Sequence, residues 1–398
     1  MVIFIIQIIG RYNTAKVFTD NLEDKAAGQI LELCNQEFVK DSHIRIMPDT
    51  HAGAGCTIGT TMTIKDKIVP NLVGVDIGCG MFVSILGKTE INFKRLDEVI
   101  RSCVPSGFDV RVNPHEYNAF LDIYNLNCKE QVDLKRASLS IGTLGGGNHF
   151  IEMNKDEDDN LYLVVHSGSR HLGKQIAEYY QNRATKEIVK KSNDEIIVEL
   201  KSQGREQDIQ KEIEKERFKI NDSLAYAQGQ TFEDYIHDMR IAQTFAEFNR
   251  KAIAEVIVRK MGFEVKDSFT TIHNYIDMNE MILRKGAISA KEGERVIIPV
   301  NMRDGSIIAT GKGNDDWNQS APHGAGRLMS RKQARLNLSL EDFKQSMDGI
   351  FTTSVSVDTL DEAPFAYKPM NEIIENIKDT VEINSIIKPI YNFKASDD

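Results

Sequence analysis

The sequence predicts a single mixed α/β domain, a β-sheet core flanked by helices, with one inserted helical hairpin. Three observations predict it: short β-branched runs that end at turns, a long charged helical stretch, and glycine–histidine motifs on both sides of that stretch. The chain has 398 residues, of which 41% are hydrophobic and 27% charged, so it is neither disordered nor fibrous. We expect residues 1–398 to form one domain.

The first elements along the chain are an apolar run and an amphipathic segment. Residues 1–9 are too few to span a bilayer and lack the flanks of a signal peptide, so we interpret them as a buried strand. Residues 22–38 carry apolar side chains at helical spacing, with Asp20 or Asn21 as the expected N-cap. Later β-branched runs are expected to be strands at residues 161–165, 296–300 and 307–310.

Residues 175–260 are expected to form a helical excursion within the domain. The middle of this stretch, residues 186–219, is mostly Glu, Lys, Ile and Gln, with Gly204 as its only glycine. Such a composition predicts an exposed helical hairpin, and a separate domain is disfavoured because related motifs lie on both sides. A solvated face is the favoured interpretation of its charge, and recognition of a target or a partner is the alternative.

Charge and cysteine content restrict the partners and the compartment. With a net charge of -10, the whole molecule does not attract nucleic acid, so binding to a polyanion requires a local basic patch or a metal. The five cysteines are odd in number and contain no CxxC pair, which makes a poor disulfide framework. We therefore expect a reducing compartment, the cytoplasm, and no membrane partner.

Glycines gather beside histidines and other polar residues. Because glycine tolerates positive φ and lets the backbone approach a ligand, such clusters mark tight functional turns. Five of the nine histidines lie in or next to a glycine cluster. We expect the loops to converge on one site from five parts of the chain: residues 49–55, 74–80, 142–149, 166–170 and 323–327.

A carboxylate, a thiol and three imidazoles occur in these turns or at expected strand ends, and together they suit one or two divalent ions. A pair of metals about 3.5–4 Å apart is a known clamp for phosphoryl chemistry. Each residue alone is more often structural, and no zinc-finger or HExxH spacing is present. The recurrence of one context favours a metal site at Asp76, Cys79, His149, His166 and His273.

His323 stands in a Pro–Gly turn that is followed by a basic stripe. A neutral imidazole is a competent nucleophile toward phosphorus, and a metal ligand or an anion-binding turn is the alternative. The stripe of Arg327, Arg331, Lys332 and Arg335 is either a phosphate contact or a solvated helix face. The sequence has no P-loop, so any nucleotide must be held by other means, and we reject a Rossmann unit. A Ser-His-Asp hydrolase is disfavoured because the GxSxG elbow is absent.

At this point the motifs can be compared with a known family. From about residue 47 to residue 394, the sequence resembles the RtcB family of GTP-dependent RNA ligases. Six motifs occur in the family order: MPDTHAG (47–53), VDIGCGM (75–81), GGNHFIE (146–152), VHSGSR (165–170), HNY (273–275) and APHGAGR (321–327). The resemblance implies an α/β fold of the RtcB type.

The resemblance also implies roles for single residues. Asp76, Cys79, His149, His166 and His273 would bind two Mn²⁺ ions, with Cys79 as the bridge. His323 would take GMP from GTP, and Asp49 would orient its imidazole. The guanylate contacts would be Asn148, Glu152, Asn301, His323, Gly324, Ala325, Gly326, Tyr367 and Lys394. RNA phosphates would meet Arg170, Arg327 and Arg331.

The implied reaction joins an RNA 3′-phosphate or 2′,3′-cyclic phosphate end to a 5′-hydroxyl end, in RNA repair or tRNA splicing. The cyclic phosphate is opened, GMP passes from the histidine to the 3′-phosphate, and the 5′-hydroxyl then expels GMP. Two alternatives are a Mn²⁺-dependent enzyme that modifies such ends without sealing them, and an inactive RNA-binding protein. The RNA target, the oligomeric state and the need for an archease-type activator stay open.

One segment departs from the family pattern. Many relatives carry PGSMGT where this chain has PVNMRDGS at residues 299–306. Asn301 would then stand in for a serine that contacts the guanylate. The change is typical of a subfamily with a narrower RNA target or a slower guanylylation.

Overall fold

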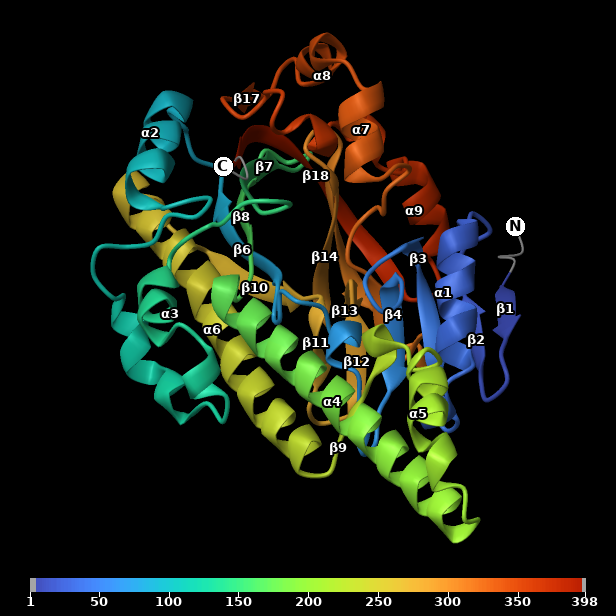
Figure 1. The fold of residues 1–398 in the computed structure, drawn as a ribbon. Helices are drawn as coiled ribbons and strands as arrows, with labels where there is room; N and C mark the ends of the chain where they lie inside the picture. The colour runs from blue at the N-terminus through green and yellow to red at the C-terminus, as the bar shows by residue number, and fades with distance from the viewer. Residues whose placement is uncertain (1–4, 396–398) are drawn as a thin grey trace.

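The computed structural model describes residues 5–395, and its strands form two main sheets (Figure 1). The smaller sheet has six strands in the order β1-β2-β3-β4-β12-β11. Helix α1 (Asp24–Cys34) packs against β1 and β2 of this sheet. The strands of this sheet are β1 (Ile6–Ile9), β2 (Thr14–Val17), β3 (Ile44–His51), β4 (Ile58–Thr63), β11 (Asn274–Asp277) and β12 (Ile282–Lys285).

The larger sheet has eight strands and curls almost into a barrel. Its main order is β10-β6-β8-β7-β18-β15-β14, with β17 paired to β18. The two ends meet, because Arg295 on β14 forms an ion pair of 2.7 Å with Asp267 on β10. The strands are β6 (Gly80–Gly87), β7 (Phe150–Lys155), β8 (Leu161–Ser167), β10 (Asp267–Ile272), β14 (Arg295–Asn301), β15 (Gly305–Gly311), β17 (Phe351–Thr352) and β18 (Val381–Lys394).

Helices cover the outer face of this sheet, while its inner face has a core of its own. Alternate residues of each strand point to opposite faces. On the outer face, Ile151 and Val165 pack with Ile253 of α6, and on the inner face Val83 and Val164 pack together. The remaining short strands are β5 (Lys67–Ile68), β9 (Ala227–Gln228), β13 (Ala287–Ser289) and β16 (Ser320–Pro322).

Nine α-helices are found in the described residues, and the two longest run side by side across the molecule (Figure 1). These are α4 (Arg170–Ser202) and α6 (Gln230–Met261). The others are α1 (Asp24–Cys34), α2 (Phe93–Cys103), α3 (Leu134–Ser140), α5 (Ile209–Arg217), α7 (Arg331–Asn337), α8 (Leu340–Ser346) and α9 (Met370–Asn376). None of the described helices is long and apolar enough to cross a membrane.

The fold confirms the mixed α/β architecture. Of the predicted helical stretch 175–260, only the part around residues 186–219 is largely exposed. Within residues 186–219 only Leu200 is buried, as expected for a protruding hairpin made by the end of α4 and by α5. Helix α6, in contrast, buries Tyr235, Met239 and Phe245 completely. Most of residues 230–260 therefore belongs to the core and not to the excursion.

The N-terminal expectations need correction. The described part of the apolar run, β1, lies at the edge of the six-stranded sheet, and Ile9 is 71% exposed. Residues 1–4 lie outside the described residues. The first helix begins at Asp24 after Glu23, which makes no side-chain cap, so neither Asp20 nor Asn21 is the N-cap. The three later strand predictions fall within β8, β14 and β15.

Candidate active site

Four of the expected metal ligands lie at the ends of four neighbouring strands of the eight-stranded sheet, on the same side of the sheet's strand ends. Cys79 directly precedes β6 and His149 directly precedes β7, while His166 is near the end of β8 and His273 directly follows β10. The strands are adjacent in the order β10-β6-β8-β7 and their pairings are antiparallel. The first residues of β6 and β7 therefore lie beside the last residues of β8 and β10, which brings the four side chains together.

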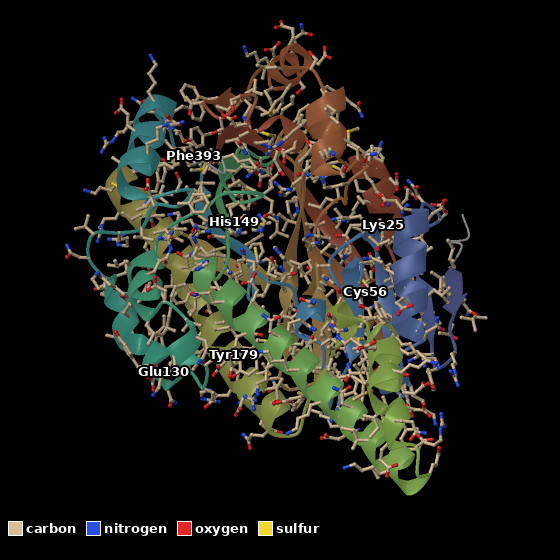
Figure 2. The ribbon with its side chains drawn as sticks, viewed as in Figure 1. Lys25, Cys56, Glu130, His149, Tyr179 and Phe393 are labelled. Atoms are coloured by element: carbon tan, nitrogen blue, oxygen red, sulfur yellow. The ribbon has the colours of Figure 1, made fainter. Side chains whose placement is uncertain are left out.

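The side chains form a compact buried cluster near the middle of the molecule, where Figure 2 labels His149. The Cys79 Sγ atom is 3.2 Å from His166 Nε2 and 3.5 Å from His149 Nε2. The Nε2 atoms of His166 and His273 are 3.4 Å apart. Asp76 joins the cluster through Oδ2, which lies 3.0 Å from His149 Nε2. All five residues expected to bind metal are thus in one place.

Hydrogen bonds on the far side of two rings fix which nitrogen faces the cluster. Nδ1 of His149 donates to the Leu144 carbonyl at 2.9 Å, and Nδ1 of His166 donates to the Asn148 carbonyl at 3.0 Å. Because a carbonyl oxygen only accepts, each Nδ1 carries a proton, which leaves Nε2 as the nitrogen that can bind a metal. This set of nitrogen and sulfur donors, with the Asp76 carboxylate beside it, fits a divalent transition-metal ion.

Burial changes the protonation of this cluster in the absence of a cation. Burial and the nearby Asp76 raise the pKa of Cys79 well above its ordinary value. Burial lowers the pKa of His166 and of His273 well below the usual range, with a smaller effect from neighbouring histidines. The imidazoles of His166 and His273 are therefore neutral and able to bind a metal, and a bound cation would favour the Cys79 thiolate.

The loop after β8 holds Asp76 in place. The Asp76 Oδ1 atom accepts a hydrogen bond from the Ser169 amide at 2.9 Å. The intervening Gly168 passes so close that a Cβ there would overlap the Asp76 carboxylate. Only glycine fits this approach without moving the carboxylate.

We expect Gly168→Ala to weaken divalent-metal binding by at least tenfold, because the added methyl group displaces the Asp76 carboxylate. Titration of the purified variant with Mn²⁺ measures the effect. Gly28→Ala is the matched control, because a Cβ at Gly28 in α1 meets nothing within 4 Å and alanine favours a helix by up to about 1 kcal/mol. Equal affinities in both variants would contradict the role of Gly168.

His323 lies beside the cluster and is paired with a buried carboxylate. Nδ1 of His323 is 2.6 Å from Asp49 Oδ2, and Asp49 is completely buried near the C-terminal end of β3. The His323 and His273 rings are 4.8 Å apart between centroids. With Nδ1 donating to the carboxylate, Nε2 is the nitrogen that carries the lone pair in the neutral ring, which is the requirement for a nucleophilic imidazole.

Short strands link His323 to the metal ligands. Strand β16 ends at Pro322, immediately before His323, and pairs with β13. The amide of Ala287 at the start of β13 donates to the His273 carbonyl at 3.2 Å. On the other side, Gly326 has a φ of +74°, and a Cβ there would lie 2.5 Å from the Asp49 carbonyl oxygen. The backbone thus fixes His323 against both Asp49 and His273.

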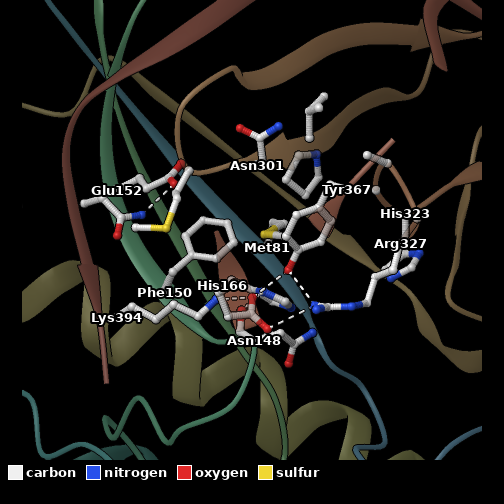
Figure 3. Close-up of a pocket in the computed structure, with 18 of the residues that line it drawn as sticks. Met81, Asn148, Phe150, Glu152, His166, Asn301, His323, Arg327, Tyr367 and Lys394 are labelled. Carbon is white, nitrogen blue, oxygen red and sulfur yellow. Dashed lines mark hydrogen bonds and ion pairs between the residues drawn. The ribbon is translucent and has the colours of Figure 1, made fainter. Parts of the chain in front are cut away.

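A pocket of about 200 Å³ opens next to His323 at the mouth of the curled sheet. Figure 3 shows Glu152 and His323 at opposite ends of it. The expected guanylate residues all line it: Asn148, Glu152, Asn301, His323, Gly324, Ala325, Gly326, Tyr367 and Lys394. Arg327 and Arg331 also line it, together with His51, Phe150, Glu362 and Asn392, which the sequence analysis did not select.

Two buried acids partner the basic stripe. Glu362 accepts from Tyr367 OH at 2.6 Å and from Lys394 Nζ at 2.5 Å. The same carboxylate forms ion pairs with Arg327 and Arg331 at 3.3 and 3.2 Å. Burial alone would raise the pKa of Glu362, but Lys394 and the two arginines outweigh it and lower the pKa to about 2.

The neighbouring Asp361 completes this acid pair. Its carboxylate contacts Arg331 at 3.1 Å and Arg335 at 3.2 Å. The stripe is therefore not a freely solvated helix face, because three of its arginines contact Asp361 or Glu362. The sequence offered one signal for these acids: they immediately precede the APFAY segment that contains Tyr367.

Asn301 and Arg170 are held by their own surroundings. The Asn301 side chain accepts from the amides of Arg303 and Asp304 and donates to the Asp304 carboxylate at 2.8 Å, so it also fixes the turn between β14 and β15. The Arg170 guanidinium donates to Thr143 Oγ1 and to the Gly107 carbonyl at 3.2 and 3.0 Å. Arg170 is absent from the residues that line the pocket.

Glu152 is a buried carboxylate that forms no ion pair with the residues described by the structure. It is 3% exposed and accepts from Asn392 Nδ2 at 2.7 Å and from Asn154 Nδ2 at 3.3 Å. Burial raises its pKa to about 7, against opposing effects of the two amides and of Lys394. Burial makes ionisation of this carboxylate unfavourable, and a carboxylate with such a raised pKa at a pocket is typical of a binding site.

We expect Glu152→Gln to stabilise the metal-free and nucleotide-free protein at pH 8. The folded pKa of about 7 exceeds the ordinary 4.5, so ionisation in the folded state destabilises the wild type above pH 7, and this effect vanishes below pH 4.5. The gain in unfolding free energy at pH 8 should be on the order of 1–3 kcal/mol. Urea unfolding of both proteins at pH 8 and pH 5 measures it, and an equal difference at both pH values would contradict the explanation.

The fold and the site together define a class: an α/β protein with a cysteine–histidine metal centre candidate beside a carboxylate-paired histidine. The chain belongs to the RtcB family. The model of that family, described as tRNA-splicing ligase RtcB, matches residues 29–131 and 111–395.

Curated relatives resemble the chain over most of its length. It is 31% identical to the RNA-splicing ligase RtcB of Escherichia coli strain K12 over 418 aligned positions, which cover 94% of this chain and 95% of that protein. It is 32% identical to RNA-splicing ligase RtcB1 of E. coli strain ATCC 25922, with the same coverage. The tRNA-splicing ligase RtcB of Aeropyrum pernix is 25% identical, with 83% of each chain covered.

Proposed function

We propose that this protein is an RNA ligase that joins a 3′-phosphate or 2′,3′-cyclic phosphate end to a 5′-hydroxyl end, with GTP and Mn²⁺, in RNA repair or tRNA splicing. The family and the names of the relatives support a ligase that acts on RNA. The observation that carries the finer proposal is the His323–Asp49 pair at 2.6 Å, placed directly beside the Cys79 cluster.

In the first step of the proposed reaction, His323 Nε2 attacks the α-phosphorus of GTP. A P–N bond forms, the bond from that phosphorus to the bridging oxygen breaks, and pyrophosphate leaves. Asp49 favours this step because its carboxylate holds the Nδ1 proton and stabilises the positive charge that develops on the ring. The glycine-rich backbone at residues 324–326 lines the same pocket and is suited to the phosphate oxygens.

In the later steps the RNA ends react. Water opens a 2′,3′-cyclic phosphate to a 3′-phosphate, whose oxygen attacks the phosphorus of the histidine-bound GMP and frees His323. The 5′-hydroxyl of the second RNA then attacks the 3′-phosphorus, and GMP leaves. Arg327 and Arg331 line the pocket and are the proposed contacts to RNA phosphates. Arg170 stays a predicted RNA contact that acts from outside the pocket.

Two Mn²⁺ ions would be held by Asp76, Cys79, His149, His166 and His273, with the thiolate as the bridge. When bound, they would supply the positive charge that stabilises oxygen anions at phosphorus. The support is the donor set itself: a buried thiol with lone-pair nitrogens at 3.2 and 3.5 Å. The remaining proposed roles concern the nucleotide, which Glu152, Tyr367 and Lys394 would contact through its base and phosphates.

The test is a ligation assay with two defined RNA strands, one ending in a 2′,3′-cyclic phosphate and the other beginning with a 5′-hydroxyl. With GTP and Mn²⁺ we expect a joined product, and none when either is omitted. Guanylylated or opened ends without joined product would instead identify an enzyme that modifies RNA ends without sealing them. A dependence on added archease-type protein would identify an activating partner.

The compartment is part of the proposal. All five cysteines are free in the structure, and four of them are buried. A metal-binding thiol such as Cys79 needs a reducing environment, so we place the reaction in the cytoplasm.

A further inference from the structure

The inner face of the curled sheet carries a buried polar group where neighbouring strands carry apolar residues. Glu152 on β7 and Asn392 on β18 are paired directly across the two strands. Asn154, two residues along β7, points to the same face. Their exposed fractions are 3%, 1% and 0%. On the same inner face, Val83, Val164 and Ile387 form an apolar cluster.

The hydrogen bonds of this group leave acceptors without donors. Because the Glu152 carboxylate oxygens accept, the Nδ2 groups of Asn392 and Asn154 must face them, and each Oδ1 must point elsewhere. Neither Oδ1 atom has a hydrogen-bond partner among the described residues. A buried acceptor left in this state costs about 1–3 kcal/mol, and a water or a ligand that reaches it can supply the missing donor.

Only one of the two amides is at the pocket. Glu152 and Asn392 line it, whereas Asn154 does not. The pocket is therefore lined by the Glu152 carboxylate and by Asn392, the residue that carries one of the two unpartnered amide oxygens. Such a lining favours a ligand edge with several adjacent N–H donors. The Watson–Crick edge of guanine has three, one on N1 and two on the N2 amine, whereas adenine presents an acceptor at N1.

We propose that Asn392 is a specificity-determining residue for the guanine base. This inference rests on the proposed function and adds a residue that the family motifs did not indicate. Its Nδ2 orients Glu152, whose two oxygens take the N1 hydrogen and one hydrogen of the N2 amine. Its Oδ1 takes the second amine hydrogen. No bond is made or broken by Asn392, and its effect is on which nucleotide binds.

Inosine triphosphate tests this assignment because it lacks only the N2 amine. We would measure kcat/KM for formation of the covalent nucleotide adduct with GTP and with ITP, using one preparation of each protein. Loss of one neutral hydrogen bond corresponds to about a three- to tenfold change. The GTP-to-ITP ratio should therefore fall three- to tenfold in Asn392→Leu. This ratio is independent of the fraction of active protein, so a general loss of stability does not change it.

Asn384→Leu is the matched control, since Asn384 lies on the same strand but is exposed and contacts Thr310 instead of the pocket. The GTP-to-ITP ratio of kcat/KM for Asn384→Leu should equal the ratio for the wild type. If Asn392→Leu does not fold, Asn392→Ser decides the question, because its hydroxyl is too short to reach both partners and the same fall is expected. Dissociation constants for GMP and IMP, which have no phosphate leaving group on the α-phosphorus, should show the same change.

The possible outcomes distinguish the role of Asn392 from the proposed ligase function. A ratio in the Asn392 variants that equals the wild-type ratio, while the wild type forms an adduct with GTP, overturns the role of Asn392 and leaves the proposed function intact. A wild type that forms no adduct with either nucleotide in the presence of Mn²⁺ overturns the proposed function, and the inference about Asn392 with it.

Discussion

His323→Ala is expected to abolish the covalent guanylyl adduct, with a loss of at least a thousandfold relative to the wild type. With Nδ1 donating to Asp49 at 2.6 Å, Nε2 of the neutral ring is the proposed nucleophile, and alanine removes it. Incubation with radiolabelled GTP and Mn²⁺, followed by denaturing electrophoresis, measures the adduct. An adduct through nitrogen should also be lost in acid and survive alkali.

The matched control is His171→Ala. This histidine belongs to the same sequence context of glycine and arginine, but it is exposed at the beginning of α4. We expect its adduct to form at the wild-type rate. If the adduct survives in His323→Ala, another residue is the nucleophile and the assignment is wrong.

Cys79→Ser is expected to have the second largest effect, the loss of high-affinity Mn²⁺ binding together with all three reaction steps. The Sγ atom lies between the imidazoles of His149 and His166, and a serine hydroxyl at this position ionises far less readily than the thiol, so the anionic ligand is lost. Metal analysis of the dialysed protein and the ligation assay measure the two losses, which should occur together.

Cys34→Ser and Cys128→Ser are the controls for this change. Both thiols are buried in the hydrophobic core beside the six-stranded sheet and the long helices, so their replacement should lower the unfolding temperature without removing metal. The same loss of Mn²⁺ in all three variants would mean that Cys79 acts only through stability. Full metal binding in Cys79→Ser would exclude a bridging thiolate.

The sequence indicated the glycine-rich loops of the site more clearly than the strand and turn residues that line the rest of the pocket. Glycine tolerates backbone positions that other residues cannot adopt, and at Gly326 the structure has a positive φ and a direct contact with Asp49. That constraint is local, so it is visible in the sequence. The edge that aligns Cys79, His149 and His166 depends instead on strand order and register, which are set by packing over the whole sheet.

Residues of the pocket wall gave weaker signals. Asn392 alternates with Tyr391 and Phe393, which face the opposite core, so a strand is indicated but not which face holds a ligand. Asp361 and Glu362 resemble ordinary acidic residues in a turn, and only the fold brings them against the arginines. Burial of a charged group depends on these long-range contacts, and for that reason it could not be derived from composition or spacing.

The edge strand β1 and the start of α1 show the same limit. An apolar run predicts burial, but the strand order places β1 outermost, where water reaches one side. Asp20 and Asn21 are good capping residues, yet the chain turns later and the helix begins at Asp24. Local preference was overruled in both places by the position of the segment in the fold.

The most direct measurement is anomalous diffraction at the manganese absorption edge from crystals of this protein grown with Mn²⁺ and GTP. We expect two peaks in each chain, both within bonding distance of the Cys79 sulfur, with His323 next to them. Manganese bound elsewhere, or a Cys79 sulfur with no peak beside it, would contradict a metal pair that adjoins the guanylyl-carrying histidine.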